Sequence, residues 1–177
     1  MVHSEYVKAA QRAIAHVQST VRYRGLNTGG GWIRHPFESN QKIVARIFNV
    51  YESRSRSAAR TEGGLDRDLY IDEMARAGEL SNTGNCSELS AIAFRYLESR
   101  EIFPIEYFTV MRGRWDHAFV VLNRDASIPV KDFASWSYQA VVCDPLYDRA
   151  ADAGHLATWY PRMFPMREQD MFWRIEP

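Results

Sequence analysis

The chain has 177 residues, of which 46% are hydrophobic and 25% are charged, and its formal net charge at pH 7 is zero. This composition is ordinary for a soluble globular protein, and the length allows one domain with a real core. A chain without net charge has no overall field that would draw it to nucleic acid or to an anionic membrane. We therefore expect no nucleic-acid partner.

No apolar run approaches the roughly 18–20 residues that a membrane-spanning helix needs. The first 18 residues carry charge throughout and lack the apolar core of a secretory signal. We expect a protein without a membrane span that is made in the cytoplasm, and export without a cleaved signal stays open. Cys86 and Cys143 are too few for a disulfide framework, so both are expected to be reduced thiols.

The N-terminal half reads as mainly helical. Apolar side chains at helical spacing predict a helix over 4–21, and a second helix is expected after Ser39. A polar stretch at 53–57 separates it from a short helix over about 66–77. We expect that helix to end at Gly78, because glycine often follows the last turn.

A further helix is predicted to begin at or next to Cys86, after a loop over 79–84. Asn85 and Glu88 have the spacing of a capping box, which marks a helix start. Apolar residues then recur at the spacing of one buried helical face, namely Leu89, Ile92, Ala93, Tyr96 and Leu97.

After Pro104 the pattern changes to short apolar runs that predict strands. These runs are 105–111, 118–122 and 139–143, with a tight turn at Gly113 and a longer excursion over 123–138. The aromatic-rich tail from His155 is expected to wrap the core as irregular structure.

Helices followed by a strand meander predict an α+β fold. We expect residues 1–177 to form a single catalytic domain. It divides into a mainly helical part (1–80), a core with the chemistry-bearing residues (81–147) and an aromatic-rich tail (148–177).

Cys86 is the candidate nucleophile. A thiol attacks only as thiolate, and a helix N-terminus favours that form because its backbone N–H groups and its positive dipole end point at the sulfur. Gly84 leaves room for a substrate at the sulfur. Cys143 lies inside an apolar strand and is expected to be a core residue.

His117 and Asp144 can complete a site with Cys86. His117 opens an apolar strand, and Asp144 ends the next one, where Pro145 stops the ladder. An imidazole beside the thiol can accept and return a proton, and a carboxylate can hold that ring and stabilise its charged form. The backbone N–H of Cys86 is one candidate donor to an oxyanion, and Asn82, Asn85 or Trp115 could supply a second.

Three segments, GNCSELS (84–90), WDHAFVV (115–121) and VVCDP (141–145), resemble the transglutaminase-like branch of the papain-like superfamily. The resemblance covers about residues 80–147. It implies a papain-like core in which a nucleophile helix packs on an antiparallel sheet, with Cys86 as nucleophile, His117 as base and Asp144 as orienting carboxylate. The stretch between His117 and Asp144 is longer than in that family, so Asp116, Asp125 and Asp132 are alternative carboxylates.

The resemblance implies an enzyme that acts on protein substrates through a thioester. Deamidation or transamidation of glutamine and proteolysis all fit, and compact bacterial toxins and secreted effectors carry similar domains. Such chemistry needs no metal and no cofactor.

Three other readings stay open. The segment 84–88 half matches the motif of arylamine N-acetyltransferases, which share the triad. Cys86, His117, Cys143 and His155 could form a zinc cage, although such cages usually contain close ligand pairs. A non-catalytic binding module could use the aromatic residues Trp159, Tyr160, Phe164, Phe172 and Trp173.

Overall fold

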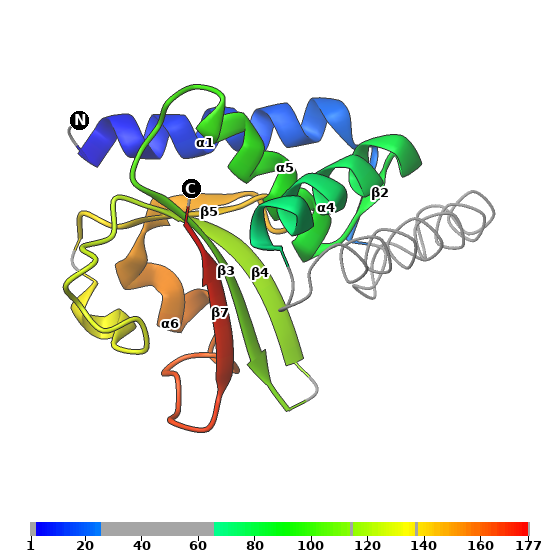
Figure 1. The fold of residues 1–177 in the computed structure, drawn as a ribbon. Helices are drawn as coiled ribbons and strands as arrows, with labels where there is room; N and C mark the ends of the chain where they lie inside the picture. Colours follow the sequence, from blue (N-terminus) through cyan, green and yellow to red (C-terminus); the bar gives the residue numbers. More distant parts are fainter. Residues whose placement is uncertain (1–2, 26–65, 114, 137, 177) are drawn as a thin grey trace.

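The computed structural model describes residues 3–25, 66–113, 115–136 and 138–176 (Figure 1). Its helices are α1 (His3–Thr20), α4 (Arg67–Ser81), α5 (Cys86–Glu98) and the short α6 (Leu156–Trp159). The helix expected after Ser39 and the polar stretch at 53–57 lie outside the described residues.

The described strands form a five-stranded antiparallel sheet with the order β6-β5-β4-β3-β7. Their bounds are β3 (Ile105–Arg112), β4 (Trp115–Leu122), β5 (Val141–Asp144), β6 (Arg149–Asp152) and β7 (Met171–Ile175). A separate short parallel pair joins β1 (Tyr23–Arg24) to β2 (Thr83–Gly84). The predicted α+β class is therefore confirmed.

Both faces of the sheet are covered, because β4 sends alternate side chains into two hydrophobic clusters. Ala118 and Val120 pack with α1, α4 and α5, whereas Phe119 and Val121 pack with the chain from Trp136 to Phe164. Figure 1 shows α1, α4 and α5 on one side of the sheet and α6 on the other. A strand buried on both faces explains why 118–122 is a continuous apolar run.

The predicted end of α4 at Gly78 is wrong, and so is most of the predicted loop over 79–84. The helix continues to Ser81 and ends because Asn82 adopts the left-handed conformation, with φ 51° and its N–H directed at the carbonyls of Glu79 and Gly78. A Cβ at Gly78 would lie 3.1 Å from Glu88 Cβ and from Ile92 Cδ1. The glycine therefore serves the close approach of α4 to α5.

The sequence predicted an irregular tail from His155, and this prediction is wrong in part. The tail contains α6 and then β7, which pairs with β3 from Tyr107 to Met111. Strand β6, which the sequence analysis did not predict, pairs with β5. Strand β4 also starts earlier than predicted, so His117 lies inside the strand, opposite Val110.

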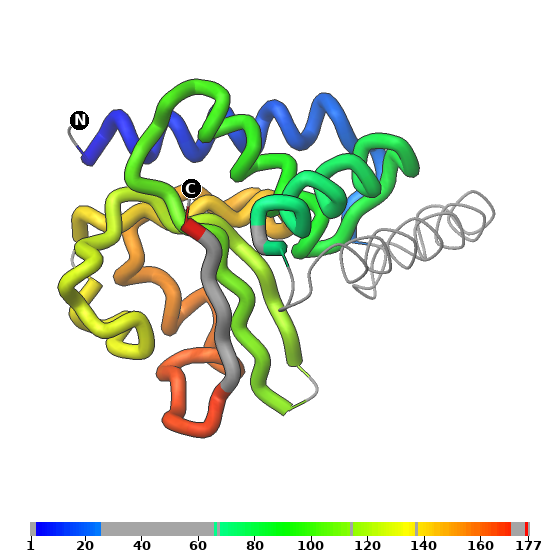
Figure 2. Tube along the Cα trace, viewed as in Figure 1, coloured from blue at the N-terminus to red at the C-terminus, as the bar shows by residue number. Residues whose placement is uncertain are grey.

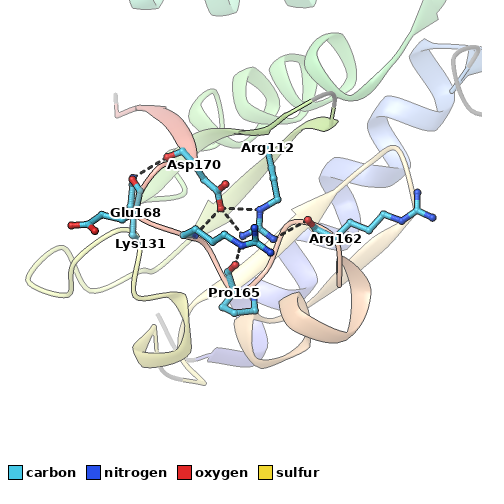
Figure 3. Close-up of polar contacts among 7 residues, drawn as sticks. Arg112, Lys131, Arg162, Pro165, Glu168 and Asp170 are labelled. Atoms are coloured by element: carbon cyan, nitrogen blue, oxygen red, sulfur yellow. Dashed lines mark hydrogen bonds and ion pairs between the residues drawn. The ribbon is translucent and has the colours of Figure 1, made fainter.

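The segment between α6 and β7 lies at the end of the sheet where the β3–β4 turn lies (Figure 2). Arg112, at the end of β3, binds this segment through Asp170 Oδ2, at 2.9 Å from its Nε, and through the carbonyls of Arg162 and Pro165. Lys131 Nζ also donates hydrogen bonds to the carbonyls of Glu168 and Asp170 (Figure 3). These contacts clamp the segment that follows Tyr160 to the sheet.

No helix in the described parts of the chain combines the length and the apolar character needed to cross a membrane.

A buried hydroxyl joins α5 to β4. Ser90, one turn after Cys86, donates its Oγ–H to the carbonyl of Ala118 at 2.9 Å. Ala118 directly follows His117 in the sequence. We expect Ser90→Ala to lower the free energy of unfolding by about 1–2 kcal/mol, because a buried acceptor loses this donor. Urea unfolding measures the change.

The matched control is Ser99→Ala, which removes an exposed hydroxyl bonded to the carbonyl of Tyr96. We expect its effect to stay within about 0.5 kcal/mol. Equal losses in the two variants would contradict the role given to Ser90.

Candidate active site

Cys86 is the first residue of α5 and is 6% exposed. Asn85 and Glu88 form the predicted capping box, in which the N–H of Asn85 donates to Glu88 Oε2 at 3.0 Å. Because the cap fixes the first turn, it also fixes the direction of the cysteine side chain. The sequence-predicted helix start is confirmed.

The chain before Cys86 is fixed by β2, which pairs with β1, and by Gly25, whose N–H donates to the Gly84 carbonyl. A Cβ at Gly84 would lie 2.8 Å from Leu89 Cδ2. The glycine therefore allows close packing of β2 against α5. This is a different reason from the substrate access expected from the sequence.

His117 and Asp144 meet on neighbouring strands. The Nε2–H of His117 donates to Asp144 Oδ2 at 2.7 Å, and the two side chains are 3% and 0% exposed. His117 and Phe119 point to the same face of β4, and their rings lie 5.8 Å apart. Asp144 is the last residue of β5, so the carboxylate lies where the strand gives way to a turn.

Asp144 receives donors on both carboxylate oxygens. Oδ1 accepts the N–H groups of Leu146 at 2.9 Å and Tyr147 at 3.3 Å. Oδ2 accepts the Tyr160 hydroxyl in addition to His117. Both oxygens of this buried carboxylate therefore have hydrogen-bond partners.

Burial by itself lowers the pKa of His117, but hydrogen bonds with Asp144 and Cys86 and the charges of both groups raise it to about 9. Nε2 is bound to Asp144, which leaves Nδ1 as the ring nitrogen for the thiol. The structure thus brings Cys86, His117 and Asp144 together, as the sequence analysis expected.

The three candidate oxyanion donors have different surroundings. Asn82 caps α4, and its Oδ1 accepts the N–H of Arg22 at 2.7 Å. Asn85 is 4% exposed and caps α5. Trp115 is 51% exposed on β4, and the Arg162 guanidinium lies 4.5 Å from its ring centroid. Both asparagines therefore have structural contacts, and an oxyanion role for any of the three stays a prediction.

The alternative carboxylates Asp116, Asp125 and Asp132 are exposed. Asp125 binds the hydroxyl of Ser127 at 2.7 Å, in the loop after β4. Asp144, which is buried and bonded to His117, is the carboxylate that the structure pairs with the imidazole.

Two tyrosines beside the triad were missed by the sequence analysis. The ring centroids of Tyr160 and Tyr147 lie 5.0 and 5.4 Å from that of His117. Tyr160 is buried, whereas Tyr147 is 46% exposed. Tyr147 lies three residues after Asp144, so its place in the sequence could have indicated that it lies near the site. Tyr160 lies in a tail without periodicity, and no sequence signal distinguished it from its aromatic neighbours.

Cys143 faces away from Asp144, into the helical cluster, where its thiol lies 3.6 Å from the carbonyl of Ala10. Burial, and secondarily the charge of Asp144, raise the pKa of this thiol. Cys143 is thus a core residue, as predicted. Within the described residues, no three or more His, Cys, Asp or Glu side chains form a group that could hold a metal ion. The four residues of the possible zinc cage therefore do not come together.

No family model, curated protein or solved structure matches this chain.

The raised pKa of His117 predicts that stability depends on pH. Below about pH 6.5 the imidazole is charged in both the folded and the unfolded chain, and its full stabilisation is present. As pH rises through about 9, the folded imidazole loses its proton and this stabilisation is lost. We expect the free energy of unfolding to fall by about 1–3 kcal/mol over this range.

Urea unfolding at several pH values measures this slope in the wild type, in His117→Gln and in His155→Gln, which replaces an exposed histidine. We expect the slope to flatten in His117→Gln and to persist in His155→Gln. A wild-type slope in His117→Gln would contradict the assignment.

Proposed function

We propose that this protein is a cysteine-nucleophile enzyme that transfers acyl groups from amide bonds of protein substrates. The observation that carries the proposal is the buried His117–Asp144 hydrogen bond of 2.7 Å, together with Cys86 at the start of α5, which helps to raise the pKa of the same imidazole. A nucleophile, a base and an orienting group within reach of one another are the requirement for thiol catalysis.

In the proposed reaction the Cys86 sulfur attacks the carbonyl carbon of a carboxamide or peptide bond. The resulting oxyanion accepts hydrogen bonds from backbone N–H groups, among them that of Cys86 at the start of α5. His117 gives its proton to the departing amine as the C–N bond breaks, which leaves a thioester on Cys86.

The thioester is resolved by water or by an amine, with His117 accepting the proton of the attacking group. Water gives deamidation of glutamine or cleavage of a peptide, and an amine gives transamidation. Asp144 stabilises the imidazolium in each half-reaction. We favour glutamine-directed chemistry, because the resemblance to transglutaminase-like effector domains supports it.

The arrangement supports a papain-like or transglutaminase-like core as a proposal. The nucleophile helix α5 packs on β4, and the imidazole and the carboxylate come from the adjacent strands β4 and β5. Because the same sheet carries both groups, the β4–β5 register fixes their separation. In this proposal the chain is a compact effector or toxin domain with a protein substrate.

The proposal predicts that Cys86→Ala abolishes modification of protein substrates. The wild type, Cys86→Ala and the matched control Cys143→Ala are incubated with a cell extract, and mass spectrometry follows glutamine-to-glutamate conversion, crosslinks and new termini. We expect modification with the wild type and Cys143→Ala, and at least a ~10³-fold loss with Cys86→Ala.

A labelled primary amine in the extract separates the outcomes, because transamidation attaches the label whereas deamidation and proteolysis do not. Equal products from the wild type and Cys86→Ala, or none from either, would contradict an enzymatic function.

A further inference from the structure

Tyr160 contacts the candidate triad from the far end of the chain. Its hydroxyl donates to Asp144 Oδ2, the same oxygen that accepts the Nε2–H of His117. The other oxygen, Oδ1, accepts two backbone N–H groups of the turn after β5. Tyr160 is thus the side chain that, together with the histidine, determines where Oδ2 lies.

The ring of Tyr160 is fixed by its packing. It stacks on Phe119 of β4, with centroids 6.1 Å apart and an interplanar angle of 10°, and it contacts Phe164. Arg149, on β6 next to β5, has its guanidinium 5.1 Å from the centroid of the Tyr160 ring. A phenol ring held in this way presents its hydroxyl in one direction, so its bond to Asp144 restrains the carboxylate.

We propose that Tyr160 is a positioning residue that holds the Asp144 carboxylate in the orientation that binds and charges His117. The inference rests on the proposed function, because it assigns a role within the same site. Tyr160 acts through the bond from its hydroxyl to Asp144.

The hydroxyl is suited to a permanent donor role. Burial first, and then the negative charge of Asp144, raise the pKa of Tyr160 well above its ordinary value. The phenol therefore keeps its proton while His117 gains and loses its own. A carboxylate that stays in place through both protonation states of the imidazole loses nothing to reorientation during the reaction.

The test is Tyr160→Phe, which keeps the packed ring and removes the hydroxyl. NMR titration of the full chain follows the His117 imidazole, whose signal is identified by its absence in His117→Gln. We expect the pKa of His117 to fall from about 9 by about one pH unit, because the carboxylate oxygen is no longer held against the ring. Tyr138→Phe, an exposed tyrosine, is the matched control and leaves that pKa unchanged.

A double-mutant cycle with Asp144→Asn tests whether Tyr160 acts through the carboxylate. We expect Tyr160→Phe to have no further effect on His117 in that background. An unchanged or raised pKa of His117 in Tyr160→Phe, or an equal fall with and without the carboxylate, would overturn the inference.

The titration needs no substrate, so it separates the two proposals. A lowered pKa of His117 in Tyr160→Phe can be observed even if the chain modifies no protein. Conversely, modification that depends on Cys86 can be observed even if Tyr160 proves irrelevant.

Discussion

The hydrogen bond between His117 and Asp144 is the interaction on which the site depends. Both side chains are almost fully buried, and burying a charged pair costs more than its attraction returns unless further hydrogen bonds satisfy it. The turn after β5 supplies backbone N–H groups, and Tyr160 supplies a hydroxyl. The pair therefore joins three separate pieces of chain, namely β4, the turn after β5 and the segment that carries Tyr160.

The surrounding fold aligns these pieces. β1 pairs with β2 just before α5, and Arg24 of β1 binds Asp148 at 2.6 Å in the turn that follows Asp144. The short strand β1 thus connects the chain just before Cys86 to the turn just after Asp144. Arg112, at the end of β3, donates hydrogen bonds to the segment that follows Tyr160. Contacts outside the triad therefore fix the relative positions of the elements that carry it.

The sequence predicted the parts of the site whose signals are local. The capping pair Asn85 and Glu88 located the start of α5, and strand alternation separated Cys143 from Asp144. Tyr160 was not predictable, because its role depends on a tail that folds across the sheet with no periodicity of its own. The end of α4 was misplaced because Gly78 serves helix packing, while Asn82 supplies the left-handed cap.

The most direct test of the account is the reaction rate of Cys86 with iodoacetamide at neutral pH, in the wild type and in Asp144→Asn. Asparagine keeps the shape of the side chain and removes its charge, and buried Cys143 is an internal reference in the same molecule. We predict rapid labelling of Cys86 in the wild type and a loss of about tenfold or more in the variant, since thiolate reactivity follows the charged imidazole. Equal rates in the two proteins, or wild-type labelling of Cys86 no faster than that of Cys143, would contradict it.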